Sequence, residues 1–113
     1  MEYPLCDQTV TLYRREGEKI CRQVIYGCYF QFQDRMKTGA NGHEYDRPFL
    51  LVIPGGTLRV FPGDRVMAGE GPAIDSEQWA RFVPALVGSL VKVGWVKPCY
   101  WEGELCHTEA GDS

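Results

Sequence analysis

The sequence predicts a small, mainly β protein, with one domain built as a β-barrel or a β-sandwich. Apolar and polar residues alternate along several segments, which is the pattern of strands with one buried face. Glycine and proline interrupt these segments at short intervals, as they do in small barrels and sandwiches. The 113 residues, of which 44% are hydrophobic, suffice for one core, so we predict a single domain over residues 1–113.

The first two strands are expected to form a hairpin. Residues 8–14 alternate in polarity, and Gly17 provides the tight bend that follows them. Residues 24–32 then alternate with apolar side chains at the even positions, which predicts a core strand. These even positions are Val24, Tyr26, Cys28, Phe30 and Phe32. Gly27 is expected to mark a bulge or a bend, and Cys28 to act as a small buried hydrophobe.

Residues 34–47 break the strand pattern and predict a long loop. The segment has fourteen residues, two glycines, an Asn41-Gly42 turn signal and only scattered apolar side chains. Connections of this length in compact domains are usually either functional or mobile. We therefore expect this loop to be the part of the chain with a role beyond folding.

The second half of the chain supplies the remaining strands. A continuous apolar run at 48–53 suits a buried strand, and Pro-Gly turns separate it from short strands at 58–61 and 64–68. Residues 90–96 and 98–107 are expected to form one or two closing strands. No internal repeat or low-complexity segment stands out.

One short helix is predicted near residues 75–83. Either Asp75 or Ser76 can act as the N-cap, and Gln78 lies three residues after Asp75, which is the spacing of a capping box. The apolar face of this helix would be Trp79, Phe82 and Val83. A helix of barely two turns is stable only when it docks on another element, here the sheet.

The charge distribution argues against binding to nucleic acid, and the lengths of the apolar stretches argue against a membrane protein. The net charge is −3, from 12 basic and 15 acidic residues, and no basic footprint for phosphate is visible. No apolar stretch is long enough to cross a bilayer, and the N-terminus does not resemble a secretory signal. We expect a cytoplasmic protein with an acidic tail, residues 108–113, that frays into solvent.

Catalytic and metal-binding patterns are weak in this sequence. The five cysteines contain no Cys-x-x-Cys pair, and His43, Glu44 and Asp46 are better explained as a solvated turn than as a metal triad. Cys106 and His107 are neighbours in a predicted strand, so their side chains are expected to face opposite ways. The sequence therefore predicts no enzyme activity, no metal and no other cofactor.

Three Asp-Arg dipeptides are the most suggestive polar feature. Two of them bracket the long loop, and the third follows a Pro-Gly turn. They are explained either as ordinary charged strand ends or as charge complementarity between neighbouring subunits of a ring. The candidates for subunit contacts or for a channel-lining loop are Asp34, Arg35, Lys37, His43, Glu44, Asp46, Arg47, Asp64 and Arg65.

Several segments resemble the small neck, or head-completion, proteins of siphophages and of prophages of Gram-positive bacteria. They are the Cys-Asp-Gln-Thr-Val-Thr-Leu-Tyr-Arg segment at 6–14, Gly-Cys-Tyr-Phe at 27–30, Phe-Pro-Gly-Asp-Arg-Val at 61–66, Gly-Glu-Gly-Pro at 69–72 and His-Thr-Glu-Ala-Gly at 107–111. The resemblance spans nearly the whole chain, and its motifs are turns and strands that specify no reaction.

The resemblance implies a virion structural protein of the head-tail connection. Stopper-type (head-closure) proteins of these phages are small SH3-like β-barrels that form a ring below the portal, with a long loop pointing into the channel. By position, that loop corresponds to residues 34–47. The implied partners are the portal or an adaptor, tail proteins and copies of the chain itself, first in the host bacterial cytoplasm and then in the virion. The long C-terminal half leaves a tail-terminator or another tail-attachment role open.

A small β-barrel binding module for peptide or single-stranded nucleic acid is the alternative. Four tyrosines are candidates for stacking on bases: Tyr13, Tyr26, Tyr29 and Tyr45. Sites of this kind combine stacking rings with a basic groove. The sequence offers no such groove, so this function ranks second.

Overall fold

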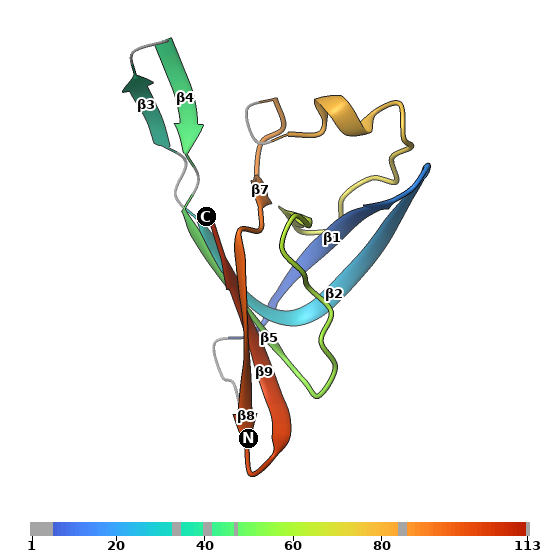
Figure 1. The fold of residues 1–113 in the computed structure, drawn as a ribbon, viewed down its shortest axis with the longest axis vertical. Coiled ribbons are helices and arrows are strands. Elements are labelled where there is room, and N and C mark those ends of the chain that lie inside the picture. The colour runs from blue at the N-terminus through green and yellow to red at the C-terminus, as the bar shows by residue number, and fades with distance from the viewer. Residues whose placement is uncertain (1–5, 33–34, 40–41, 47, 84–85, 113) are drawn as a thin grey trace.

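The computed structural model describes residues 6–32, 35–39, 42–46, 48–83 and 86–112, and within them the protein is mainly β, as predicted. The elements are β1 (Gln8–Glu16), β2 (Lys19–Phe32), β3 (Arg35–Gly39), β4 (Gly42–Asp46), β5 (Phe49–Pro54), β6 (Arg65–Ala68), the 3-10 turn η1 (Trp79–Arg81), β7 (Leu90–Lys92), β8 (Trp95–Trp101) and β9 (Glu104–Gly111). Figure 1 shows their arrangement. No helix in these ranges is long and apolar enough to cross a membrane.

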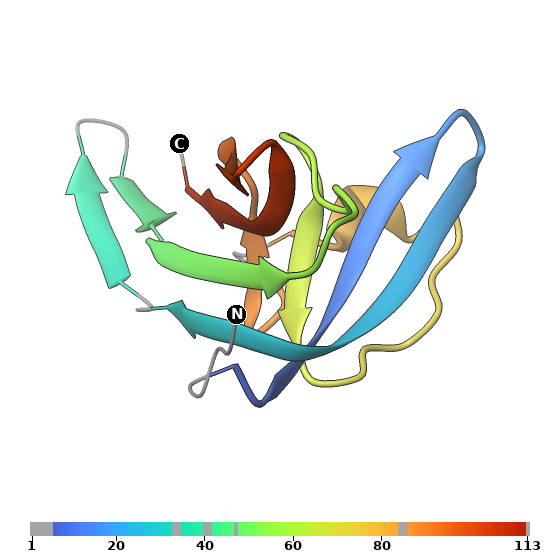
Figure 2. The same ribbon diagram turned by 90° about the horizontal axis from the view of Figure 1, so that it is seen from below.

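Seven strands form one curled antiparallel sheet in the order β7-β6-β1-β2-β5-β9-β8, and β3 and β4 form a separate two-stranded sheet. The large sheet curls into a half-barrel, as Figure 2 shows. Its two edge strands, β7 and β8, are joined only by residues 93–94. The Val93 N–H donates to the Asp64 carbonyl beside β6, and the Gly94 N–H donates to the Gly111 carbonyl in β9. Residues 93–94 therefore bridge the two edges of the curled sheet.

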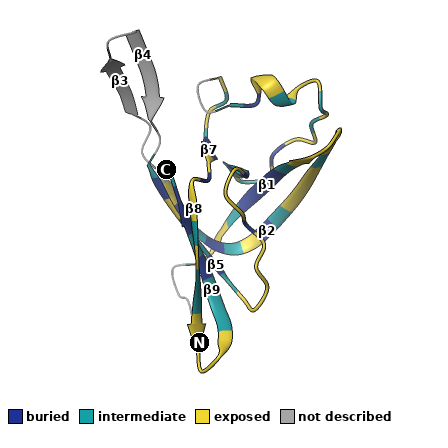
Figure 3. Ribbon diagram, viewed as in Figure 1, coloured by how far each residue is buried: buried dark blue, intermediate teal, exposed yellow. Residues whose placement is uncertain are grey.

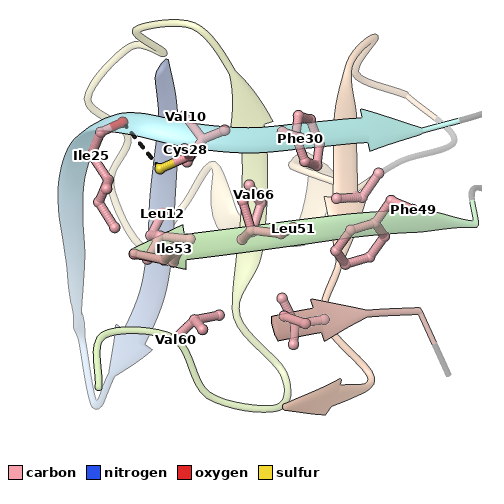
Figure 4. Packing of buried hydrophobic residues seen from close by; sticks show 13 residues of the cluster. Val10, Leu12, Ile25, Cys28, Phe30, Phe49, Leu51, Ile53, Val60 and Val66 are labelled. Atoms are coloured by element: carbon pink, nitrogen blue, oxygen red, sulfur yellow. Dashed lines mark hydrogen bonds between the residues drawn. The ribbon is translucent and has the colours of Figure 1, made fainter. Parts of the chain in front are cut away.

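The concave face of the half-barrel contains the hydrophobic core. Figure 4 shows how side chains from opposite strands meet there, and Figure 3 shows the buried stretches along the strands. The cluster consists of Val10, Leu12, Ile25, Cys28, Phe30, Phe49, Leu51, Ile53, Val60, Val66, Val91, Val93 and Ala110. Residues from both ends of the chain contribute to it, so the core forms only when the whole sheet is assembled.

A β-bulge at Gly27 changes the predicted alternation of β2. Ile25 pairs with Val10 and Cys28 pairs with Gln8, so the bulge adds one residue to β2. Ile25 and Cys28 are both buried, whereas Tyr26 is 67% exposed. Gly27 has a φ of 75°, a conformation that a residue with a Cβ adopts only with strain. The predicted bulge is confirmed, and the prediction that Tyr26 belongs to the core face is wrong.

The predicted helix is reduced to the single 3-10 turn η1. The capping box does form: the Gln78 N–H donates to Asp75 Oδ1 at 2.9 Å, and the Asp75 N–H donates to Gln78 Oε1 at 3.0 Å. Phe82 then leaves the helical region, with φ of −87° and ψ of 67°. Its ring packs edge-on against Tyr13 with centroids 4.5 Å apart. Phe82, Tyr13 and Leu90 form a second small buried cluster, and the packing of Phe82 there ends the helix after one turn.

The segment predicted as a loop at 34–47 contains the β3–β4 hairpin instead. The two strands pair from Arg35 opposite Asp46 to Gly39 opposite Gly42. In this register Arg35 is opposite Asp46 and Lys37 is opposite Glu44, so residues of opposite charge occupy facing positions. The glycines and polar residues of this segment resemble those of a loop, so its strands were not predicted from its own sequence pattern.

Three further expectations differ from the structure. Residues 108–111 do not fray but belong to β9, which is hydrogen-bonded on both sides, to β5 and to β8. β9 lies inside the sheet and not at its edge, and Thr108 and Ala110 are buried there, with Ala110 in the core cluster. The run at 48–53 forms β5, yet its burial alternates and Leu50 is 37% exposed. Residues 58–61 form no strand, although Val60 reaches the core.

Replacing Gly71 with alanine should destabilise the protein by about 1–3 kcal/mol, the usual range for overpacking. A Cβ at this position would overlap the Tyr13 hydroxyl, which donates to the Pro72 carbonyl at 2.7 Å, and the Met67 sulfur. Gly88→Ala is the control, because a Cβ there meets nothing within 4 Å. Urea denaturation of the two variants measures the difference; equal free energies of unfolding would contradict this packing.

The buried thiol of Cys28 should make stability fall at alkaline pH. Burial raises the pKa of Cys28 from 9.0 to about 11. Above pH 9 the thiol of the unfolded chain loses its proton while the buried thiol keeps it, so the stabilisation is complete below pH 9 and is lost as the pH rises toward 11. The stability difference between wild type and Cys28→Ala should shrink by roughly 2 kcal/mol across this window. A difference that stays constant from pH 9 to 11 would show that the thiol is not buried.

Candidate functional site

Five of the predicted contact residues lie on the β3–β4 hairpin: Arg35 and Lys37 on β3, and His43, Glu44 and Asp46 on β4. The other two candidates from this segment, Asp34 and Arg47, lie outside the described residues. Figure 2 shows the hairpin projecting beyond the ends of β2 and β5, away from the curled sheet. The hairpin therefore presents these five positions at one end of the molecule.

Asp64 is not available for subunit contacts, contrary to the prediction. Its side chain is 3% exposed and accepts from Arg14 Nε and Nη2, both at 2.8 Å. The Phe61 N–H donates to the same carboxylate at 2.9 Å. The hydrogen bond to Asp64 raises the pKa of Arg14, which keeps this guanidinium charged. The carboxylate thus serves the fold of this chain, at the corner where residues 93–94 bridge the sheet edges.

Arg65, the last predicted contact residue, also acts within the chain. Its guanidinium lies 3.7 Å from the centre of the Trp79 ring, and Nη1 donates to the Trp79 and Phe82 carbonyls at 2.6 and 2.7 Å. Desolvation lowers the pKa of this arginine. Arg65 therefore ties η1 to β6, and the prediction that it meets another subunit has no support from these contacts.

A cluster that the sequence analysis missed lies on the β8–β9 hairpin. The Cys99 thiol donates to Glu109 Oε2 at 3.0 Å, and His107 Nε2 lies 3.4 Å from the same oxygen. Potential ligand atoms of all three residues lie within 4.8 Å of one another. Among the residues that the structure describes, these three form the group that could hold a metal ion.

Pairing of β8 with β9 brings the three residues together. Cys99 lies directly opposite His107, and Glu109 follows His107 by two residues on the same strand. A bulge between Cys99 and Tyr100 makes Cys106 the extra residue of β9. Alternation along the strand describes only Cys106 and His107 and gives no sign of this cluster, because the partner of His107 is Cys99 on the other strand. The cluster could be predicted only from the pairing register of β8 and β9, which neither strand specifies by itself.

The electrostatics of the cluster do not suit a nucleophilic cysteine. The hydrogen bond to Glu109 raises the pKa of Cys99, with desolvation and the negative charge of Glu109 acting in the same direction. The same hydrogen bond lowers the pKa of Glu109, and His107 lowers it further. Reactive cysteines need a depressed pKa beside cationic groups. The thiol here is a protonated donor to a carboxylate.

The same hairpin exposes large aromatic side chains. Tyr100 and Trp101, at the end of β8, are 64% and 65% exposed, and Trp95 at its start is also exposed. Figure 3 shows the exposed lower end of this hairpin. Because β8 is an edge strand, its outer backbone groups and its aromatic side chains lie at the same border of the sheet.

Four tyrosines were predicted as candidates for stacking on bases, and the structure gives the exposure of three of them. Tyr13 is completely buried against Phe82, so it cannot stack on a base. Tyr26 is exposed, with its hydroxyl donating to Glu70, and Tyr29 is half-buried. The side chain of Tyr45 lies outside the described residues. The three rings whose positions are described, those of Tyr13, Tyr26 and Tyr29, do not make one exposed platform.

Comparisons with known proteins bring no further identification. A scan against models of protein families found no match, and searches of curated proteins and of solved structures found none either.

Asp64→Asn should destabilise the chain by about 2–4 kcal/mol, because three N–H donors converge on the two carboxylate oxygens and an amide offers only one oxygen. Asp7→Asn, at an exposed position, is the matched control and should change stability by less than about 0.5 kcal/mol. Chemical denaturation of both variants checks the prediction, which fails if the two unfold at the same denaturant concentration.

Proposed function

We propose that this protein is a structural component of a phage or prophage virion, which assembles as a ring at the head-tail connection below the portal. The proposed partners are the portal or an adaptor, tail proteins and further copies of the chain. Assembly takes place in the host bacterial cytoplasm, and the finished ring belongs to the virion. The proposal rests on the resemblance of several segments to neck proteins and on one structural observation, the projecting β3–β4 hairpin.

The β3–β4 hairpin supports an assembly role because it has few interactions of its own to stabilise it. It forms a sheet of two strands, separate in hydrogen bonding from the seven-stranded sheet. An isolated two-stranded sheet is marginally stable in water and gains stability from packing against other surfaces. A neighbouring subunit would supply such a surface. The hairpin also has both signs of charge, Lys37 opposite Glu44 for example, as an interface between identical subunits requires.

The edge strand β8 supplies a second surface suited to assembly. Its exposed Tyr100 and Trp101 are of the residue type enriched in the buried centres of protein interfaces. An unpaired strand edge is also a template for pairing with another chain. Two such surfaces on one protomer, the hairpin and this edge, are what a ring of identical subunits uses for its two different neighbours.

We also propose that the protein acts through assembly and not through catalysis. The Cys99, His107 and Glu109 cluster is the arrangement closest to a catalytic one in the described ranges, and the raised pKa of Cys99 is opposite to what a nucleophile needs. Without an activated nucleophile, this cluster offers no acyl-transfer chemistry.

Co-expression with the portal, adaptor and tail proteins encoded beside this chain tests the proposal. We expect the wild-type chain to co-purify with one of them as a ring, measured by native mass spectrometry and electron microscopy. A variant in which a Gly-Ser linker replaces residues 35–46 should keep its circular dichroism spectrum and lose the ring. Lys92→Ala, an exposed position on β7 that belongs to neither the replaced hairpin nor β8, is the control and should still assemble.

Two results would contradict the proposed function. One is a set of neighbouring genes that encodes no portal, capsid or tail protein. The other is a chain that stays a compact dimer at every concentration, with the β3–β4 hairpin covered in the dimer interface. If the linker variant still assembled into a ring, the β3–β4 hairpin would not be required for assembly, contrary to the proposal.

A further inference from the structure

We propose that Cys99, His107 and Glu109 bind a single Zn²⁺ ion on the β8–β9 hairpin. The inference is independent of the proposed assembly function, because it depends on different residues. It also departs from the sequence expectation of no metal, which considered ligands spaced closely along one segment. Here two ligands come from β9 and one from β8, and the ladder brings them together.

The distances between the ligand atoms approach those of a tetrahedral zinc site. Zinc binds sulfur at about 2.3 Å and nitrogen or carboxylate oxygen at about 2.0–2.2 Å, so tetrahedral ligands lie roughly 3.4–3.6 Å apart. His107 Nε2 and Glu109 Oε2 are 3.4 Å apart, and Cys99 Sγ and Glu109 Oε2 are 3.0 Å apart. Binding requires the sulfur and the carboxylate to separate by about half an ångström, a change that side-chain rotation supplies.

The chemical mixture of the ligands favours zinc over the other common divalent ions. Magnesium and calcium prefer shells made only of oxygen, and a thiolate with an imidazole selects softer metals. Binding breaks the S–H bond of Cys99, whose proton passes to solvent, and forms the Zn–S bond without any redox change. The thiolate and the Glu109 carboxylate then balance the two positive charges of the ion. Three protein ligands leave the fourth position to a water molecule.

The ligand positions lie on the paired part of the β8–β9 ladder, where Cys99 is opposite His107, and the bulge begins on the turn side of that pair. The strands pair from Trp95 opposite Gly111 to Trp101 opposite Glu104, and a tight turn with positive φ at Glu102 and Gly103 joins them. All three ligand side chains are half-buried, which leaves the ion a path from solvent and still restricts the ligand rotamers. Ligands placed on two hydrogen-bonded strands are held near each other before the metal arrives, so little ordering is needed on binding.

Isothermal titration calorimetry of the full-length, metal-free chain with ZnCl₂, in a phosphine reductant, tests the site. We expect one Zn²⁺ per chain and a higher thermal unfolding midpoint when the metal is present. Cys99→Ser and His107→Gln should each weaken zinc binding by about tenfold or more. Cys21→Ser, which removes an exposed cysteine from β2, is the matched control and should bind like wild type.

A spectroscopic measurement separates ligation from structural effects of the substitutions. Co²⁺ bound to wild type and to Cys21→Ser should show thiolate-to-cobalt charge-transfer absorption in the near ultraviolet, and Cys99→Ser should lack it. Glu109→Gln, which keeps the size of the side chain, should lower zinc affinity with an unchanged circular dichroism spectrum. Equal zinc affinity of wild type and Cys99→Ser, or a loss in Cys21→Ser as large as in Cys99→Ser, would overturn the proposal.

Discussion

The two-residue connection between the edge strands is the constraint on which this structure depends. β7 and β8 lie at opposite ends of the strand order, yet only residues 93–94 separate them in the chain. Seven strands can satisfy this connection only if the sheet curls until its edges come near each other. The curl turns one face into a closed interior, and that interior holds the buried side chains of β1, β2, β5, β6, β7 and β9. Val93 itself is part of the core.

The polar interactions near this connection explain why charged residues are placed there. The Asp64 backbone carbonyl accepts from the Val93 N–H, and its carboxylate holds Arg14 and the Phe61 N–H. Arg65, the next residue, holds η1 against β6. A buried carboxylate without partners would cost several kcal/mol, and three donors here offset that cost. Asp64 and Arg65, which resemble surface charges at a strand end in the sequence, therefore make contacts within the chain that hold this corner together.

Two hairpins extend from the half-barrel and leave different surfaces open. The β3–β4 hairpin has cross-strand pairs of opposite charge, and the β8–β9 hairpin combines exposed aromatic side chains with the Cys99, His107 and Glu109 cluster. A zinc ion at that cluster would link β8 to β9 close to Tyr100 and Trp101. The metal would thereby restrain an edge strand that the assembly proposal assigns to subunit contacts. The two proposals meet on this hairpin, although each stands on its own residues.

The strand character of this protein follows from its sequence alone, because alternation of polarity is a local property. The sequence also predicted the β1–β2 hairpin, the bulge at Gly27, the burial of Cys28 and the capping box of Asp75 with Gln78. Which residues meet across strands depends on the tertiary structure. Cys99 reaches His107 through the register of β8 and β9, Asp64 reaches Arg14 through the pairing of β1 with β6, and residues 108–111 are ordered by strands on both sides. Such contacts depend on pairing between distant segments, and the periodicity of a single segment carries no information about its partner.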